Sequence, residues 1–145
     1  MEELVIALKK ALANTFAFYL KAHGFHWNVT GPDFHQYHTM LGNIYEEVYG
    51  SIDQFGEEIR ALGDYAPASF ARFAALTDIE DELKIPPALT MIERLLADNE
   101  KVLAVIEAAY NAAEANHAHG LSNFLAERQD AHKKHAWMLS ATLKR

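Results

Sequence analysis

Hydrophobic and small residues recur every three or four positions along most of the chain, which is the spacing of one face of an α-helix. In the first such stretch they fall at Leu4, Leu8, Leu12, Thr15, Tyr19 and Ala22. The chain has four prolines, all between such stretches: Pro32, Pro67, Pro86 and Pro87. Proline there does not interrupt a helix. No stretch has the two-residue alternation of a β-strand, so the sequence predicts an all-α protein.

Capping and breaking residues indicate where the helices end. The segment 28–32 contains a Gly-Pro stop signal, Asp33 can cap the next helix, and Gly63 can end it. Asn116 is a candidate cap for the last helix. The predicted helices cover residues 2–28, 34–62, 88–115 and 117–143, with a short helical piece near 69–76 inside the link 64–87.

Four long helices with short first and third links predict a four-helix bundle. The middle link, about two dozen residues long, can carry the chain back along the bundle, as the one-crossover ferritin-like topology requires. We expect a single domain over residues 1–145.

Composition narrows the function classes. The chain has 20 acidic and 13 basic residues, a formal net charge of −7, 8 histidines and no cysteine. The acidic balance argues against a nucleic-acid binder held by a basic face, and the absence of cysteine excludes disulfides and thiolate ligands. No apolar run approaches the roughly 20 residues that span a bilayer, and the charged start has no signal-peptide core. We expect a cytoplasmic protein that does not contact membranes.

The candidate chemistry lies in the first two helices. His26 and His38 flank the same turn, whereas Asp53 and Glu57 are one helical turn apart and share a face. Two imidazoles and two carboxylates suit iron, manganese or zinc.

The spacing of these residues constrains how they bind. His38 and Asp53 are 15 residues apart on one helix, hence roughly 22 Å apart along its axis, while metal–ligand distances are about 2 Å. One subunit therefore cannot join all four residues around one metal. An antiparallel two-fold pairing of the second helix would place His38 of one copy beside Asp53 of the other, so the spacing predicts at least a dimer.

Three segments carry a resemblance to a known family: His26-Trp27-Asn28-Val29-x-Gly31-Pro32-x-Phe34-x-x-x-His38, Asp53-x-x-x-Glu57 and Ala131-His132-Lys133-Lys134-His135-Ala136-Trp137-Met138-Leu139. Over essentially its whole length the chain resembles the Dps-type miniferritins (DNA-binding proteins from starved cells) of the ferritin-like superfamily. The resemblance implies a hollow twelve-subunit cage that oxidises Fe(II), usually with hydrogen peroxide, and stores the ferric product. It also implies that His26 and His38 bind iron from one subunit and Asp53 and Glu57 from another. Trp27 is then a candidate electron donor.

Two features depart from the family pattern. Many members have an acidic residue four positions after the second histidine, where this chain has Gly42, so a second iron would be held by water, by His35 or only transiently. DNA-binding members usually carry a basic tail ahead of the first helix, which is predicted here to begin almost at Met1. The C-terminal Lys144-Arg145 adds little positive charge. Direct DNA binding is therefore not expected.

The remaining histidines have packing interpretations as well as chemical ones. We expect His23, His132 and His135 to be structural, because Lys133 and Lys134 beside the last pair would repel a cation. His35 is open between a surface residue and an auxiliary ligand.

The start of the last helix is a further candidate region. Glu114 and His117 match the Glu-x-x-His pattern of larger di-iron bundles, but the predicted break at Asn116 separates them. The family resemblance places the three-fold pores for iron entry near Glu114, His119, Asn123 and Glu127.

Together these observations predict a ferroxidase and iron-storage cage, a homo-oligomer that protects against oxidative stress and is a dodecamer by resemblance. Iron is the expected metal, with up to two ions per site and zinc or manganese as substitutes. The oxidant would be hydrogen peroxide or oxygen. The alternatives are a cage that coats DNA or another partner, with a secondary metal site, and a metal-free helical assembly.

Overall fold

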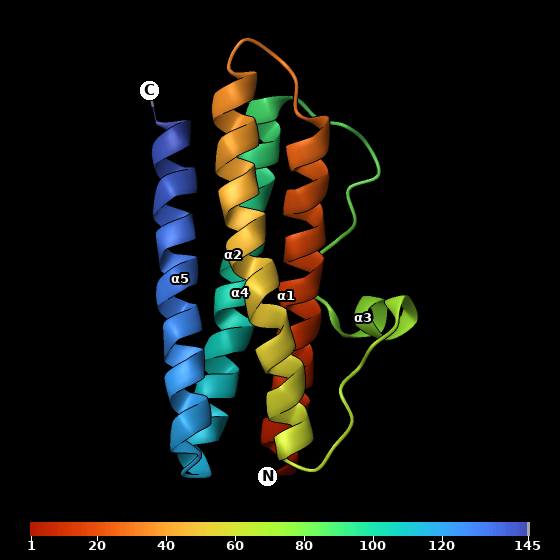
Figure 1. The fold of residues 1–145 in the computed structure, drawn as a ribbon, viewed down its shortest axis with the longest axis vertical. Coiled ribbons are helices and arrows are strands. Elements are labelled where there is room, and N and C mark those ends of the chain that lie inside the picture. The colour runs from red at the N-terminus through yellow and green to blue at the C-terminus, as the bar shows by residue number, and fades with distance from the viewer. Residues whose placement is uncertain (145) are drawn as a thin grey trace.

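Four long helices pack side by side as a bundle (Figure 1). The computed structural model describes residues 1–144. Its helices there are α1 (Glu2–Asn28), α2 (Phe34–Ala61), α3 (Phe70–Leu76), α4 (Ala88–Ala115) and α5 (His119–Leu143). No residue in this range forms a strand. The predicted all-α bundle, with a short helix in the middle link, is confirmed.

The middle link determines the topology. The chain runs along α1 and returns along α2, and the link through α3 then carries it back to the end of the bundle where α2 began (Figure 1). Helix α4 therefore runs parallel to α2, and α5 returns antiparallel to α4. Helix α1 packs against α2, α3 and α4, whereas α5 packs mainly against α4. This is the one-crossover arrangement of ferritin-like bundles.

Glycine closes helix α2. Gly63 has φ +96°, and its N–H donates to the Arg60 carbonyl at 3.0 Å, while the Asp64 N–H donates to the Ile59 carbonyl at 3.4 Å. This is the Schellman pattern that glycine favours. Asp33 stands at the predicted cap position of α2, but its side chain makes no capping hydrogen bond.

The predicted start of the last helix was wrong. Asn116 ends α4 instead of capping α5, and α5 begins two residues later than expected, at His119. His117 takes a left-handed conformation, φ +55°, and the Ala118 N–H donates to the Ala113 carbonyl at 2.9 Å. A second Schellman turn therefore closes α4 with a residue other than glycine.

The middle link is fixed to the bundle. Asn14 of α1 is fully buried, and its Oδ1 accepts hydrogen bonds from the Asp78 N–H at 2.9 Å and the Thr77 hydroxyl at 3.0 Å. Glu82 forms an ion pair with Arg94 of α4. The acidic run 78–82 is thus anchored to the bundle at both ends.

Each long helix contributes to one core. The largest fully buried side chains include Phe18, Phe55, Ile92, Ile106 and Leu125. Within residues 1–144, no helix has an apolar stretch long enough to cross a membrane.

Candidate metal centre

The side chains of His26 and His38 are held by each other's backbone. His26 Nδ1 lies 2.6 Å from the His38 carbonyl oxygen, and His38 Nδ1 lies 2.8 Å from the His26 carbonyl oxygen. A carbonyl only accepts hydrogen bonds, so each Nδ1 carries a proton and donates it. The Nε2 of each ring is then the atom left free to bind a metal, which is how second-layer hydrogen bonds prepare histidines for metals.

Gly42 of α2 is buried against the ring of His26. A Cβ at this position would lie 3.1 Å from Cε1 and 3.2 Å from Nδ1 of that ring. Protein interiors are packed so closely that such an overlap forces a neighbour to move. Gly42 therefore allows α2 to approach α1 closely enough for the two histidines to exchange their hydrogen bonds.

Asp53 and Glu57 lie on one exposed face of α2. A hydrogen bond between the two carboxyl groups, together with the negative charge of Asp53, raises the pKa of Glu57. The pair borders a cavity of about 660 Å³, whose apolar wall includes Leu12, Phe16, Ile52, Phe70 and Phe73. Two adjacent carboxylates favour a proton or a cation between them.

The two pairs do not meet within one chain. In the described residues 1–144, no group of three or more His, Asp or Glu side chains is arranged to hold a metal ion. The structure brings His26 to His38 and Asp53 to Glu57 but leaves the pairs apart, in agreement with the helical spacing. Their union in one ligand set remains a prediction.

Aromatic side chains surround His23, one turn before His26. The His23 ring stacks on Tyr45 with centroids 3.7 Å apart, and its Nδ1 lies 2.9 Å from Tyr19 Oη. Trp27 packs on His23 at 4.0 Å, and the Tyr45 ring is 5.1 Å from that of His26. We call the following residues the aromatic cluster: Tyr19, His23, Trp27, Tyr45 and Tyr49. The four-residue spacings of Tyr19 with His23 and of Tyr45 with Tyr49 were the available sequence signal.

Burial shifts the proton affinities in the aromatic cluster. Burial, and then the charge of His26, lowers the pKa of His23 below its ordinary value. Burial, and then the neighbouring Tyr49 and Tyr45, raises the pKa of Tyr19. At neutral pH the cluster thus holds a neutral imidazole beside a protonated phenol.

Comparison with known proteins identifies the fold family. Residues 6–145 match the family model for the ferritin-like domain. The chain belongs to the ferritin-like domain family. It is 28% identical to DNA protection during starvation protein 2 of Bacillus anthracis, over 98% of this chain and 97% of that protein. It is also 28% identical to the DNA protection during starvation protein of Brevibacillus brevis, over 99% of this chain and 97% of that protein.

Solved structures agree with this assignment. The ferritin-like chain matches Dps from Bacillus brevis with a TM-score of 0.92 at 27% identity, covering 97% of this chain and 95% of that one. It matches Dps from Staphylococcus aureus with a TM-score of 0.94 at 26% identity, covering 100% and 97%. A Dps protein from Vibrio cholerae O1, described as a ferritin-like diiron-carboxylate protein, gives 0.94 at 26% identity, covering 99% and 90%. The resemblance to Dps proteins is confirmed.

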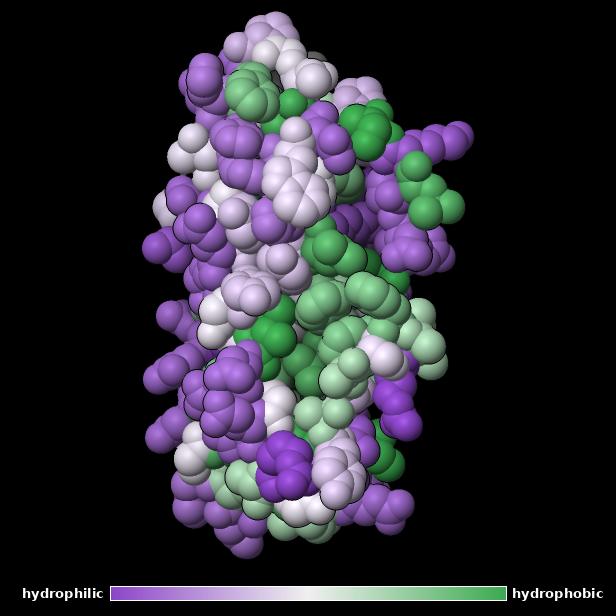
Figure 2. Space-filling view, turned by 45° about the vertical axis from the view of Figure 1, so that its right-hand side comes forward, coloured by the Kyte–Doolittle hydropathy of each residue, from purple (hydrophilic) through white to green (hydrophobic). Residues whose placement is uncertain are grey.

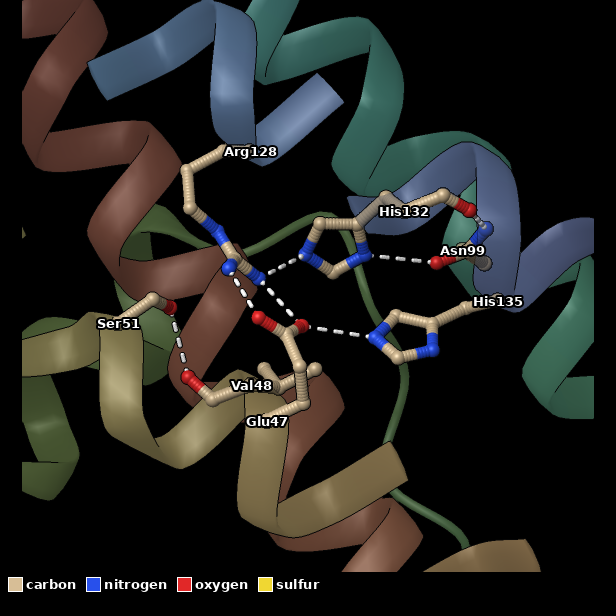
Figure 3. Close-up of polar contacts among 7 residues, drawn as sticks. All are labelled: Glu47, Val48, Ser51, Asn99, Arg128, His132 and His135. Atoms are coloured by element: carbon tan, nitrogen blue, oxygen red, sulfur yellow. Dashed lines mark hydrogen bonds and ion pairs between the residues drawn. The ribbon is translucent and has the colours of Figure 1, made fainter. Parts of the chain in front are cut away.

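In this ferritin-like bundle the α5 histidines belong to a buried network (Figure 3). Glu47 of α2 accepts hydrogen bonds from Arg128 at 2.5 and 3.0 Å, and its Oε1 lies 2.8 Å from His135 Nε2. Arg128 also donates to His132 Nε2 at 3.1 Å, and His132 Nδ1 donates to Asn99 Oδ1 at 2.8 Å. The guanidinium lies where a metal ion would have to approach His132. The predicted packing role of both histidines is confirmed.

Burial and charge pairing shift the pKa of Glu47 in opposite directions. Burial would raise the pKa of Glu47, but the hydrogen bonds from His135 and Arg128 outweigh it and hold the pKa far below the ordinary value. At His132, burial followed by the charge of Arg128 lowers the pKa well below 6.5, so this imidazole is neutral. Sequence reasoning missed both Glu47 and Arg128.

The remaining candidates lie apart from the two pairs. Glu114 is in the last turn of α4 and His117 follows its end, so they share no helical face, as predicted. The rings of His117 and His119 are 6.4 Å apart. The exposed His35 packs against Phe34. The pore role of the α4–α5 turn and the ligand role of His35 remain predictions.

Proposed function

We propose that this protein is a ferroxidase and iron-storage protein, with each oxidation site shared by two subunits. His26 and His38 of one copy would face Asp53 and Glu57 of an antiparallel partner, with up to two Fe(II) ions as substrate. Zinc or manganese would occupy the same nitrogen and oxygen ligands. By likeness to the Dps proteins, twelve copies would enclose the ferric product and so protect against oxidative stress.

The observation that carries this proposal is the reciprocal hydrogen bonding of His26 and His38. It fixes both tautomers and leaves both Nε2 atoms free to bind a metal, which supports the ligand role. The complementary charge lies further along α2, where Asp53 and Glu57 share a hydrogen bond with each other. Each chain thus has one half of a site at each end of α2.

An exposed apolar face supports the two-fold pairing. Figure 2 shows hydrophobic residues gathered on the side of the molecule that carries α3. Five of them line one cavity of about 540 Å³: Leu20, Trp27, Phe70, Leu83 and Ile85. Phe70 also lines the cavity beside Asp53 and Glu57, so the apolar surface continues from Trp27 to the carboxylates. Exposed apolar patches of this kind mark interaction surfaces.

The four proposed ligand residues would position the iron and supply negative charge for its oxidation. The imidazole Nε2 atoms and the carboxylates hold Fe(II), and the carboxylates stabilise the higher charge of Fe(III). A cation between these two carboxylates competes with the proton whose binding the raised pKa of Glu57 favours. Hydrogen peroxide or oxygen takes the electrons, and Fe(III) hydrolyses and moves to the interior.

Subunit complementation tests the proposal. One variant carries His26→Ala and His38→Ala, and the other carries Asp53→Asn and Glu57→Gln; alone, each is expected to lose Fe(II) oxidation. When the two are refolded together, half of the random dimers contain one of each and so one intact site. The mixture should recover about one quarter of the wild-type rate. A mixture no faster than its parents would contradict the shared site, and full activity of either parent would overturn the ligand assignment.

DNA coating is a second candidate function, favoured by the names of the curated relatives. The net charge of −7 opposes it, because phosphate binding needs clustered Lys and Arg. We expect no gel shift of duplex DNA at low salt. A shift that weakens steeply as salt is added would favour this function instead.

A further inference from the structure

Three side chains of metal-binding type, distinct from those of the proposed iron site, meet in the α2–α5 network: Glu47, His132 and His135 (Figure 3). Both imidazoles are buried, whereas the Glu47 side chain is 39% exposed. The carboxylate therefore connects the buried histidines to solvent. Two imidazoles and one carboxylate are also the protein ligands of several zinc and non-haem iron sites.

His132 is held in the tautomer that a metal ligand needs. Asn99 Nδ2 donates to the His132 backbone carbonyl at 2.8 Å, and Asn99 Oδ1 lies 2.8 Å from His132 Nδ1. Because the amide nitrogen is committed to that carbonyl, the amide oxygen faces the ring and accepts the Nδ1 proton. The Nε2 atom of the neutral ring therefore keeps its lone pair, as in a histidine that a second-layer hydrogen bond has prepared for a metal.

Arg128 fills the space between these potential ligands (Figure 3). Its Nη2 atom lies 3.0 Å from Glu47 Oε1 and 3.1 Å from His132 Nε2, and the same Oε1 is 2.8 Å from His135 Nε2. Among the described residues, Arg128 Nε is buried without a hydrogen-bond partner, so only the end of the guanidinium that faces the ligands is satisfied. A permanent positive charge thus stands where a metal ion would bind.

We propose that Arg128 is a built-in cation that fills a two-histidine, one-carboxylate site and so excludes divalent metal ions from the bundle interior. Zinc binds nitrogen and oxygen at about 2.0–2.2 Å, so Glu47 and His132 would each have to move inward by about 1 Å. The guanidinium prevents this movement, in agreement with the lack of an open metal-ligand group in residues 1–144. Because arginine does not lose its proton, no physiological change of pH opens the site.

Removal of the guanidinium should turn this place into a metal site. Glu47 would supply its negative charge, His132 its Nε2 lone pair, and His135 would release its Nε2 proton and bind through that atom. Water would complete the coordination. Such a site favours Zn(II), Co(II) or Fe(II) over Mg(II), because two of its ligands are imidazoles. The inference does not depend on the ferroxidase proposal, because the two sites share no ligand.

Metal titration of Arg128→Ala tests this proposal. Zn(II) binding is measured by titration calorimetry on the assembled protein, in a parent that carries His26→Ala and His38→Ala so that the proposed iron site is silent. Arg128→Ala should bind one Zn(II) per chain more than this parent. Co(II) in its place should give the visible absorption bands of a low-coordinate ion. Adding His132→Ala should weaken the new binding by at least about tenfold.

A matched control and a stability measurement complete the test. Arg94→Ala also removes an arginine from an ion pair with a glutamate, and it should gain no Zn(II). Because a ligand that binds only the folded state stabilises it, Zn(II) should raise the urea midpoint of Arg128→Ala, and His132→Ala should abolish that increase. Arg128→Gln keeps a neutral hydrogen-bond donor beside Glu47 and should show the same Zn(II) effects if the alanine variant does not fold.

The outcomes decide the role of Arg128 separately from the ferroxidase activity. The proposal is overturned if neither Arg128→Ala nor Arg128→Gln gains Zn(II) or is stabilised by it, or if the gained ion stays after His132 and Glu47 are both replaced. It is also overturned if His132→Ala removes a bound Zn(II) while Arg128 is present, because the site would then be open already. None of these results changes the expected oxidation of Fe(II) by wild type.

Discussion

His26 and His38 each donate Nδ1–H to the other residue's carbonyl, at 2.6 and 2.8 Å. The last carbonyls of a helix have no partner within it, and His38 satisfies one of these at the end of α1. The same two bonds therefore close a helix end, join α1 to α2 and fix the nitrogen atoms offered to a metal. A substitution that disturbs the packing of α1 against α2 beside these histidines should therefore also change the affinity for metal.

Gly42→Ala is expected to weaken metal binding without unfolding the protein. The new Cβ would lie 3.1 Å from the His26 ring, so the ring must shift away from its hydrogen bond. Alanine gains about 1 kcal/mol in helix propensity, which offsets the strain. Titration calorimetry should show Zn(II) affinity reduced about tenfold, as for other losses of a ligand's hydrogen-bond support.

Gly50→Ala on the same helix is the control for this substitution. A Cβ at Gly50 has no neighbour within 4 Å. We expect a gain of about 0.5–1 kcal/mol in unfolding free energy and unchanged Zn(II) affinity. Equal affinities in the two variants would show that Gly42 does not support His26.

His117→Gly is expected to stabilise the bundle. His117 has φ +55° at the end of α4, a conformation that costs a residue with a side chain about 1 kcal/mol and glycine very little. Urea unfolding should show a gain of about 0.5 kcal/mol, since glycine also loses more chain entropy on folding. His119→Gly, in the first turn of α5, should instead destabilise. A loss in both variants would count against the left-handed conformation of His117.

The helix ends could be predicted where their signals are local. Gly63 and the prolines mark turns by their own backbone preferences, and the helices they border end within one residue of expectation. The turn after α4 was misread because its left-handed residue is His117, not glycine. Asn116 is as good a cap by type as any residue nearby, so only the hydrogen bonds of Ala118 reveal the true boundary.

In the candidate site, too, some residues could be predicted from local sequence patterns and others could not. The pair Asp53/Glu57 could be found from helical spacing, and the pair His26/His38 from its position on either side of one short turn. Glu47, by contrast, meets Arg128 across 81 positions of sequence, and no local pattern encodes that contact. The packing role of Gly42 was also invisible, since a glycine opposite a histidine ring is defined only by how closely two helices approach.

The ion pair between Lys21 of α1 and Asp98 of α4 offers a stability test. The charged atoms are 2.8 Å apart, and the side chains are only 11% and 7% exposed. Lys21→Met would leave the Asp98 carboxylate buried without its counter-charge, which costs about 3 kcal/mol. Adding Asp98→Asn should restore about half of this loss by removing the charge. Urea denaturation of wild type, the two single variants and the double variant would measure the coupling energy between Lys21 and Asp98. Additive losses would exclude coupling of the pair.

Acid should destabilise the protein through the network of Figure 3, in two separate ranges of pH. The lowered pKa of His132 means that the unfolded chain binds a proton there below about pH 6.5 while the folded chain does not. The lowered pKa of Glu47 has the same sign, with an onset near the ordinary value of about 4.5. Both groups therefore contribute stability at neutral pH that is lost progressively in acid.

Glu47→Gln separates the two contributions. It removes the carboxylate that pairs with Arg128 and His135, so we expect a loss of about 2 kcal/mol at pH 7, reduced from the fully buried case because Glu47 is partly exposed. Between about pH 6.5 and 5 the variant should lose stability as steeply as wild type, because His132 still titrates. Below about pH 4.5 its stability should fall less steeply with pH, because one carboxyl with a depressed pKa is gone.

Urea midpoints at fixed protein concentration measure both slopes. The exposed neighbour Glu46, changed to Gln, should leave both slopes unchanged. If Glu47→Gln keeps the wild-type slope below pH 4.5, the acid sensitivity lies outside this network.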